Sequence, residues 1–267
     1  MPELPEVETI VKQLQKHLGG KKITSAQVIE KSRADKLIEK VMPSQAVKIW
    51  RRAKAIIIEL EGKKFILVRL GMTGHFHYAA PGKSLGQDEK YTIVKFFLQD
   101  GARVSYTDLR KFGSVRLLNQ GQLEKKLSAF GPEPLAKEFT VAVFRGLLTR
   151  KKKANIKVTL MDQNFLAGIG NIYAQEALYH AAINPQRKIS TLKDSEIRRL
   201  QGALQKVLRQ SIQHNGTTVD NYAHMEGAGN FQKYLAVYEK VKCPRKHPLK
   251  KIYLGGRGTY YCPTCQR

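Results

Sequence analysis

The sequence of 267 residues has few cysteines, few acidic side chains and no long apolar run. Its three cysteines, Cys243, Cys262 and Cys265, cluster near one end, and an odd, clustered set does not suit a disulfide framework. Apolar runs such as residues 55–58 are far too short to span a bilayer. These absences argue against a disulfide-stabilised secreted domain and a membrane-spanning chain, and they favour a reducing, intracellular setting.

The shortage of acidic residues leaves a strongly basic chain: 47 lysines and arginines stand against 22 aspartates and glutamates, a net charge of +25. Such a field attracts polyanions, and a phosphate backbone is the usual partner. The sequence has no amphipathic anchor rich in basic residues and tryptophan, so an anionic membrane surface is a weaker candidate. No secretion signal is visible at the start. We therefore expect a cytoplasmic protein that binds nucleic acid and associates with the nucleoid, with a generally basic surface or a ribosomal-type protein as the alternatives. A monomer is the expected state.

The N-terminal segment predicts an amphipathic helix that begins beside Pro2 and Glu3. Apolar residues recur at helical spacing, and Gly19-Gly20 ends the pattern. Proline and acidic residues are also ordinary in a first helical turn, so simple capping is an alternative explanation of this segment. The apolar stripe consists of Leu4, Val7, Ile10, Val11, Leu14 and Leu18.

Removal of Met1 would make Pro2 the chain terminus and give it a secondary amine. The partial positive charge of a helix N-terminus disfavours an extra proton on that amine, so more of it would be a free nucleophile near neutral pH. Attack on a carbon electrophile would give a covalent imine-type intermediate, and Glu3 could supply the proton that such a reaction needs. The segment therefore predicts nucleophilic catalysis at Pro2.

Short strands joined by hairpin turns follow the first helix. Glu61-Gly62 and Asp100-Gly101 are typical turn pairs, which predicts an antiparallel sandwich or a flattened barrel. Residues 79–90 are expected to form a loop. The predicted strands are residues 53–60, 64–70, 91–98, 102–107 and 114–118.

The pattern changes from strands to helices at residues 131–136, a segment rich in proline that predicts a linker. We expect a first domain over residues 1–130, a helical domain over 137–233 and a strand–turn–strand segment over 234–267. The predicted helices are residues 141–149, 156–162, 171–181 and 195–214.

The cysteines belong to a metal-binding pattern. Cys243-x3-His247 is followed 15 positions later by Cys262-x2-Cys265. Two close pairs of sulfur and nitrogen ligands, separated by a hairpin-length insert, are typical of a tetrahedral structural zinc site. His247 is the weakest member of the set, because a surface histidine near free cysteines would give the same pattern.

Two glycine-containing turns have the character of phosphate-binding sites. Gly168 and Gly170 lead into the helix predicted at Asn171, and the amide groups of a helix N-terminus attract an anion. Arg257 lies in a Gly-Gly-Arg-Gly turn, where the backbone can approach a phosphate closely. Lys157 adds positive charge nearby in the sequence. An ordinary helix start and a solvated turn arginine are the alternative explanations.

These motifs, in this order, resemble bacterial-type formamidopyrimidine-DNA glycosylases over essentially the whole chain. PELPEVET is similar to the family's catalytic N-terminus, DQNFLAGIGNIYAQEAL to its helix–two-turn–helix and GGRGTYYCPTCQR to half of its zinc finger. The resemblance implies an α+β fold of two domains. An N-terminal helix and an antiparallel β-sandwich would form the first, and a helix–two-turn–helix domain with a β-hairpin zinc finger the second.

The resemblance also implies an activity: base-excision repair of double-stranded DNA that contains damaged bases or abasic sites, by a glycosylase and lyase with one structural zinc ion. The implied substrates are oxidised purines such as 8-oxoguanine and formamidopyrimidines. Pro2 would attack the anomeric carbon and form a Schiff base, Glu3 would protonate the sugar ring oxygen, and Glu6 would hold the segment in place. Elimination of both phosphates would follow. The phosphates beside the lesion would be clamped by Lys54, Asn171 and Arg257.

An enzyme that takes a base out of the stack must fill the gap. Met72 lies in one turn, and Arg110 and Phe112 lie in another; apolar wedges and an arginine suit insertion into a duplex. The resemblance implies that these three fill the void and that Arg110 contacts the orphaned base and favours cytosine. Without the resemblance, Met72 and Phe112 would be interpreted as residues at the edge of the core. Residues 217–231 are similar to the family's lesion-capping loop.

Three features depart from the family's pattern. His247 replaces a cysteine, so the zinc site would have three cysteines and one histidine. Arg69 stands where many members have histidine, and it could still bind phosphate. Glu239 puts an acid near the entrance to the zinc finger.

Two other functions compete with this interpretation. An endonuclease VIII-like enzyme would prefer oxidised pyrimidines, but such proteins usually begin Pro-Glu-Gly-Pro-Glu and lack the Met72, Arg110 and Phe112 arrangement. A zinc protein that only binds nucleic acid would explain the charge and the cysteines, but not the proline beside Glu3. Excision assays on 8-oxoguanine opposite cytosine and on thymine glycol distinguish a formamidopyrimidine-DNA glycosylase from an endonuclease VIII-like enzyme.

Overall fold

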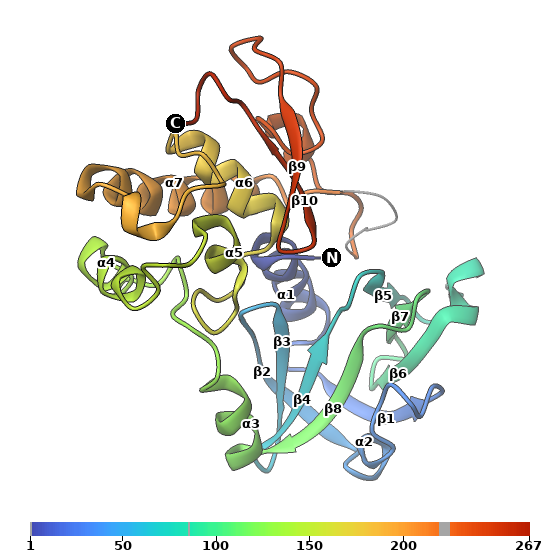
Figure 1. Ribbon diagram of the computed structural model, residues 1–267. Helices are drawn as coiled ribbons and strands as arrows, with labels where there is room; N and C mark the ends of the chain where they lie inside the picture. The colour runs from blue at the N-terminus through green and yellow to red at the C-terminus, as the bar shows by residue number, and fades with distance from the viewer. Residues whose placement is uncertain (1, 85, 219–224) are drawn as a thin grey trace. The chain divides into compact units, whose positions relative to one another are not determined.

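The computed structural model describes residues 2–84, 86–218 and 225–267, and Figure 1 labels its helices and strands. These residues form two compact units. The first unit contains the chain up to Ser128 together with Asn215–Asn230. The second contains Ala129–His214 and Phe231–Arg267.

Helix α1 (Leu4–Leu18) opens the first unit and is held by its apolar face. The stripe predicted from the sequence is buried throughout, and no member is more than 2% exposed. Pro5 stands in the first turn, where a helix does not use the missing N–H. The Gly19 N–H donates to the carbonyl oxygens of Leu14 and Gln15 and ends the helix. The predicted amphipathic helix is confirmed with its boundaries.

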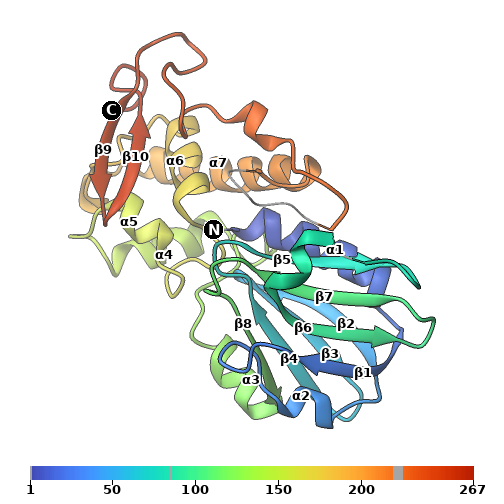
Figure 2. The same ribbon diagram turned by 90° about the vertical axis from the view of Figure 1, so that its right-hand side faces the viewer.

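An antiparallel sheet of eight strands makes up most of the first unit. Its strands are β1 (Lys22–Val28), β2 (Ser44–Arg52), β3 (Ala55–Leu60), β4 (Lys64–Arg69), β5 (Gly74–Ala79), β6 (Thr92–Leu98), β7 (Arg103–Asp108) and β8 (Ser114–Asn119). Their order across the sheet is β5-β7-β6-β1-β2-β3-β4-β8. Figure 2 shows the β5-β7-β6-β1 half side by side.

Two four-stranded halves share one apolar core. Strands β1 and β2 are joined by only two residue pairs, Lys22 with Gln45 and Ile23 with Ser44, so the sheet divides there. Side chains from α1 and from both halves meet in a single buried cluster. This arrangement is the antiparallel sandwich expected from the sequence.

A smaller apolar cluster covers the other face of strands β3, β4 and β8. Helix α3 (Gln120–Leu127) contributes Leu123 to it, and Ile57 and Leu67 contribute from β3 and β4. This explains why β3 and β4 are apolar almost without interruption, since both faces of each strand are covered. The short helix α2 (Leu37–Lys40) and the 3-10 helix η1 (Gly86–Tyr91) complete the unit.

The five predicted strands are all present, but three further strands had no clear sequence signal. Strand β1 has the sequence KITSAQV and buries only Ile23 and Val28, so polar residues hide its alternation. Strand β2 is similarly polar, and β5 contains Gly74 and two histidines. The predicted loop 79–90 contains η1, whose side chains at residues 86–87 are not described.

The second unit is mainly helical and ends in a β-hairpin. Its elements are α4 (Val141–Thr149), α5 (Ile156–Met161), α6 (Asn171–His180), η2 (Ile189–Thr191), α7 (Asp194–Gln213), η3 (Phe231–Tyr234), β9 (Lys250–Leu254) and β10 (Arg257–Tyr261). The four predicted helices match α4 to α7 within a residue at each end. None of the helices that the structure describes is long and apolar enough to cross a membrane.

The structure groups the predicted capping loop differently from our expectation. We assigned residues 217–233 to the helical domain, but residues 215–230 group with the first unit. The reason lies in α1: the Thr217 N–H donates to Glu6 Oε1 over 2.8 Å, and the Met225 N–H donates to Gln13 Oε1 over 3.0 Å. The hairpin segment 234–267 groups with the helices rather than separately. Residues 219–224 lie outside the described residues.

Candidate active site and metal centre

The segment before α1 is buried and held by Glu6. Pro2 is buried, and Glu3 is only 3% exposed. The Glu3 N–H donates to Glu6 Oε2 over 2.8 Å, and the Glu3 carbonyl oxygen accepts from the Val7 N–H over 3.1 Å. The backbone beside Pro2 is therefore fixed to the first turn of α1. The side chains predicted to be nucleophile, proton donor and support thus lie within one turn.

The second oxygen of Glu6 binds the chain on the C-terminal side of α7. Glu6 Oε1 accepts the Thr217 N–H, and Glu6 as a whole is only 2% exposed. Gly216 has a φ of +80°, and a Cβ there would lie 2.9 Å from Glu6 Oε1. Only glycine permits this approach without movement. A single carboxylate thus fixes both the N-terminal segment and the start of residues 217–231.

Lys54 lies in the turn between β2 and β3, and this turn is fastened to α1. Arg51 Nε donates to Glu8 Oε2 over 2.8 Å, and the Arg51 side chain is only 9% exposed. Arg69, the last residue of β4, is exposed and pairs across the sheet with Ala55, the neighbour of Lys54. The two predicted phosphate-binding cations are therefore at the same end of the sheet.

Met72, Arg110 and Phe112 are brought together by two turns. One Arg110 guanidinium nitrogen lies 3.3 Å from Met72 Sδ, and the guanidinium carbon lies 4.7 Å from the centre of the Phe112 ring. Phe112 is 56% exposed, which is unusual for a large apolar side chain. The interpretation of Phe112 as a core residue is therefore wrong, while the clustering fits an inserted wedge.

A buried aspartate holds these two turns together. Asp108 is fully buried, and its Oδ1 accepts the Thr73 hydroxyl over 2.6 Å and the Arg110 N–H over 3.2 Å. Its Oδ2 accepts the Gly113 N–H over 2.7 Å. Gly71, in the facing turn, has a φ of +65°, and a Cβ there would lie 2.6 Å from the Gly113 nitrogen. Sequence reasoning missed Asp108, which has no pattern beyond its place at the end of β7.

In the second unit, Asn171 begins α6 and is held from two sides. Its Oδ1 accepts from Lys157 Nζ over 2.7 Å, and its Nδ2 donates to the Gly258 carbonyl oxygen over 3.1 Å. We predicted Lys157 as an added surface charge for DNA binding, but its side chain is fully buried. Its ammonium group orients Asn171 instead.

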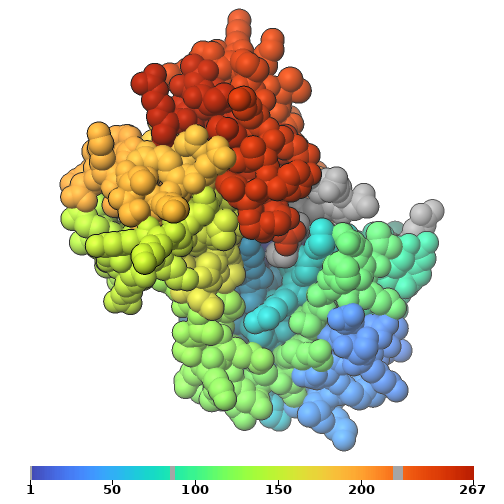
Figure 3. Space-filling view, viewed as in Figure 1, coloured from blue at the N-terminus to red at the C-terminus, as the bar shows by residue number. Residues whose placement is uncertain are grey.

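The β9–β10 hairpin presents Arg257 close to α5. Gly255 packs against Val158, because a Cβ on Gly255 would lie 3.1 Å from the valine side chain. Arg257 opens β10 and is exposed, and much of the C-terminal segment, coloured red, lies at the surface in Figure 3. Through Gly258, the hairpin also contacts Asn171. The predicted phosphate-binding residues of the second unit therefore lie near one another.

Glu176 is a further buried acid that the sequence did not reveal. Its carboxylate accepts the backbone N–H groups of Ala236, Val237 and Tyr238 over 2.7–3.0 Å. Burial raises the pKa of Glu176, although these three hydrogen bonds act in the opposite direction. The side chain anchors the chain where it leaves η3 toward the cysteine cluster.

The four predicted metal ligands come together. Cys243, His247, Cys262 and Cys265 each place a ligand atom within 4.8 Å of the others, which is the spacing of a metal site. His247 Nδ1 lies 3.2 Å from Cys265 Sγ and 3.7 Å from Cys243 Sγ. His247 is therefore part of the cluster and not a separate surface histidine. A set of three thiols and one imidazole matches the preferences of zinc.

The pKa values of Cys243 and Cys265 differ, and a bound cation would favour the ionised form of the thiols. Desolvation opposes ionisation of Cys243, but hydrogen bonds from the backbone of His247 and Arg245 and from the Tyr179 and Cys262 side chains together lower the pKa of Cys243 to about 6. Desolvation, and then the neighbouring Cys262 and Cys243, raise the pKa of Cys265 to about 11. Adjacent thiolates repel one another, so a bound divalent cation would favour ionisation of all three.

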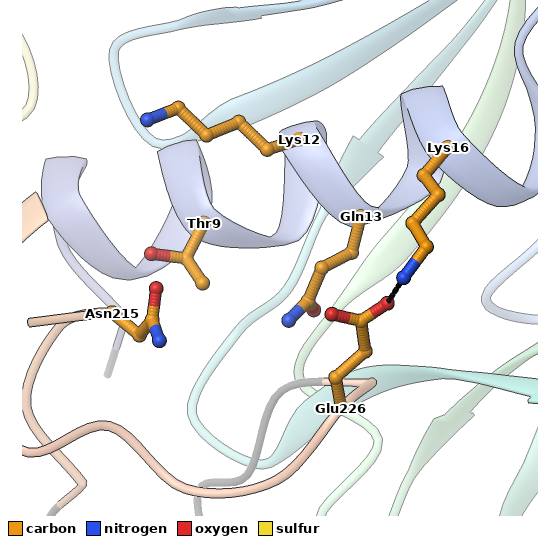
Figure 4. Close-up of a pocket in the computed structure, with 6 residues that line it drawn as sticks. All are labelled: Thr9, Lys12, Gln13, Lys16, Asn215 and Glu226. Atoms are coloured by element: carbon orange, nitrogen blue, oxygen red, sulfur yellow. Dashed lines mark hydrogen bonds and ion pairs between the residues drawn. The ribbon is translucent and has the colours of Figure 1, made fainter. Parts of the chain in front are cut away.

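A polar pocket of about 310 Å³ opens beside α1. In Figure 4, Lys16 points toward Glu226, with 2.7 Å between Nζ and Oε1. Both side chains are substantially exposed, so the pair adds little stability. The pocket is lined by Thr9, Lys12, Gln13, Lys16, Asn215 and Glu226. None of these residues is among the predicted catalytic residues, and we place the candidate active site at Pro2 and Glu3.

Comparison with known proteins defines the class. A model of the formamidopyrimidine-DNA glycosylase N-terminal domain matches residues 1–115, and a model of the formamidopyrimidine-DNA glycosylase H2TH domain matches residues 130–223. The fold and these two matches together define a DNA glycosylase.

Individual relatives agree along the whole chain. Formamidopyrimidine-DNA glycosylase from Pelotomaculum thermopropionicum is 40% identical and that from Desulforamulus reducens 37%, each covering 100% of this chain and 99% of the relative. The complex of a Lactococcus lactis FPG mutant with DNA containing Fapy-dG has a TM-score of 0.91 and 32% identity, with 100% of both chains covered. The complex of Lactococcus lactis Fpg with DNA containing an abasic site has the same TM-score and identity, with 99% of each chain covered. The chain therefore belongs to the formamidopyrimidine-DNA glycosylase family, as its motifs predicted.

We predict that Asp108→Ala destabilises the first unit by at least about 1.5–3 kcal/mol, the usual contribution of one hydrogen bond to a charged group. Three donors around Asp108 would lose their acceptor. Unfolding in guanidinium chloride measures the loss in the free energy of unfolding. Asp100→Ala is the matched control, because Asp100 forms an exposed pair with Lys21 and should cost less. Equal losses for the two variants would contradict a supporting role for Asp108.

Proposed function

We propose that this chain removes oxidised purines, including 8-oxoguanine and formamidopyrimidines, from double-stranded DNA and then cleaves the abasic site as a lyase. The observation that supports this most directly is the placement of Pro2 and Glu3 before α1, with Glu6 binding the Glu3 N–H. Membership of a DNA glycosylase family supports the reaction class. The Lactococcus lactis complexes with Fapy-dG and abasic DNA support the substrate class.

The first step would be attack by the Pro2 amine, freed by removal of Met1. The nitrogen lone pair bonds to C1′ of the damaged nucleotide as the bond from C1′ to the base breaks, and the base leaves with the proton that the Pro2 nitrogen loses. Transfer of a proton from the Glu3 carboxyl to the sugar ring oxygen opens the ring and leaves an iminium between Pro2 and C1′. The positive end of α1 favours the uncharged amine that begins this sequence.

The lyase steps would follow from the same intermediate. The iminium withdraws electrons from C2′, so loss of a C2′ proton expels the 3′ phosphate. A second elimination expels the 5′ phosphate. Addition of water to the remaining iminium releases the sugar fragment and restores the Pro2 amine. Glycosylase and lyase activities would therefore share one nucleophile.

Both units would grip the DNA through its phosphates. Lys54 and Arg69 offer cations at one end of the sheet, and Asn171 and Arg257 offer an amide and a guanidinium in the second unit. Phosphate contacts fix position without reading sequence. The net charge of +25 strengthens the attraction.

Met72, Arg110 and Phe112 would occupy the gap left by the extruded nucleotide. An apolar side chain can enter the stack, while the guanidinium can bond to the edge of the opposite base. The exposed Phe112 ring and the contacts of Arg110 with Met72 and Phe112 support this role.

The cluster of Cys243, His247, Cys262 and Cys265 would hold one zinc ion. Four protein ligands complete a tetrahedral shell, so the ion would be structural and would leave no position for catalysis. Its effect would be to hold the base of the β9–β10 hairpin, which carries Arg257.

The role of Pro2 is tested by trapping with borohydride, which reduces an iminium to a stable amine. We expect the processed protein to form a covalent complex with DNA that contains 8-oxoguanine or an abasic site. A variant with one extra residue before Pro2 converts its amine into an amide and should trap nothing, yet bind the DNA with similar affinity. Cleavage by this blocked variant would show that Pro2 is not the nucleophile.

The role of Arg110 is tested by changing the base opposite 8-oxoguanine. Arg110→Ala should reduce the preference for cytosine by about 1–3 kcal/mol, the usual discrimination of a good base contact. Rates of excision opposite each of the four bases measure it. Arg116→Ala is the control, because Arg116 is paired with Asp35 in the same unit and should keep the preference. A wild-type protein that is indifferent to the opposite base would refute the assignment.

Removal of zinc should loosen the hairpin. After chelation, trypsin should cut faster near Lys250, Lys251 and Arg257, and binding to DNA should weaken, because the hairpin loses its anchor. Metal analysis should give one zinc ion per chain at this cluster, and Cys265→Ser should lower that content. Zinc added back to the chelated protein controls for irreversible damage. A metal-free chain with unchanged resistance to trypsin would contradict a structural role.

A further inference from the structure

The edge strand β5 carries two histidines on its outer face. His75 and His77 are two residues apart, so strand geometry places them on the same side. Phe76, between them, is 1% exposed and belongs to the core, which fixes the histidines on the face away from the core. Their ring centres are 4.4 Å apart. Two imidazoles this close can supply two ligands to one metal ion.

Helix η1 supplies an acid to the same place. Asp88 Oδ2 lies 3.7 Å from His77 Nε2. One ligand atom from each of His75, His77 and Asp88 lies within 4.8 Å of the other two. The three residues come from two segments, so an ion bound by them would join η1 to β5.

Neighbouring groups set the orientation of the imidazoles. His75 Nδ1 lies 3.0 Å from the Thr73 carbonyl oxygen, which can only accept, so Nδ1 is the donor and Nε2 is the nitrogen left to face an ion. Such a bond from the far nitrogen is the usual support for a metal-binding histidine. His77 Nε2 lies 3.0 Å from the Thr107 hydroxyl.

The surrounding face is polar. Thr107 and Ser105 pair across the sheet with His75 and His77, so their side chains share that face. The Ser105 hydroxyl is fully buried, and within the described part of the chain it has no hydrogen-bond partner. It is placed to bind a further ligand of an ion, such as water. The adjacent cations Lys95 and Arg103 are paired with Glu89 rather than with Asp88.

We propose that His75, His77 and Asp88 form a second metal site, separate from the cysteine cluster, for a borderline divalent transition ion such as Zn²⁺. Two imidazoles and one carboxylate suit such an ion better than Mg²⁺ or Ca²⁺, which prefer oxygen ligands throughout. Three protein ligands leave room for water in the remaining positions. The site lies wholly within the first unit and does not depend on the proposed function.

A titration with Co²⁺ tests the site, because its spectrum distinguishes the two ligand sets. Cobalt at the cysteine cluster gives a thiolate-to-metal charge-transfer band, whereas cobalt bound only by nitrogen and oxygen does not. We expect the full-length protein to bind one equivalent that adds no thiolate band. Zn²⁺ followed by calorimetry should show the same extra equivalent in protein that already holds zinc at the cysteines.

His77→Asn and Asp88→Asn should each lose this equivalent and keep the thiolate band, which also shows that the variants are folded. His214→Asn is the matched control: it removes a histidine outside the cluster, one that stacks on Tyr234, and should retain the extra ion. The proposal is overturned if the wild-type protein binds metal only with the thiolate band, or if both cluster variants still bind the extra equivalent.

Discussion

The buried carboxylate of Glu6 is the contact on which the proposed chemistry depends. Its two oxygens accept backbone N–H groups from Glu3 and Thr217, which are far apart in the sequence. A buried carboxylate needs such partners, and here each partner belongs to a segment with a proposed task. Gly216 lets the second segment approach. The amine of Pro2 and the start of the proposed capping loop are therefore positioned by the same side chain.

The other proposed DNA-binding groups follow the same design, in which a buried polar side chain holds a less buried one. Asp108 binds the backbone of the turn that carries Arg110, and Lys157 binds Asn171. Glu176 binds the backbone that leads to the cysteine cluster. Buried hydrogen-bonded groups of this kind are costly to disturb, so they give precision to the exposed side chains. Under the proposed function, direct contact with DNA would be left to groups at the surface.

The sequence predicted those parts of the fold that have a strong local pattern. The apolar stripe of α1, the alternating or continuous apolar strands β3 and β4, and the helix caps of the second unit all have the expected boundaries within two residues. Strands β1, β2 and β5 had no such signal, because tertiary pairing and not side-chain alternation determines them. Local patterns also could not show that residues 215–230 join the first unit, since two hydrogen bonds to α1 decide it.

Some features of the candidate site could likewise be predicted from the sequence, and others could not. Motif spacing was enough to predict the Cys243, His247, Cys262 and Cys265 cluster, and it placed Met72 and Arg110 in turns that the fold brings into contact. The burial of Lys157 and the supporting role of Asp108 depend on three-dimensional surroundings that a linear pattern does not contain.

The location of the reduced bond is the most direct test of the proposed nucleophile. After borohydride trapping with abasic DNA and digestion of both polymers, mass spectrometry can assign the sugar remnant to one peptide. We expect it on the nitrogen of Pro2, in a peptide that no longer carries Met1. A remnant on a lysine side chain, such as that of Lys54, would contradict the claim that the chain terminus performs the reaction.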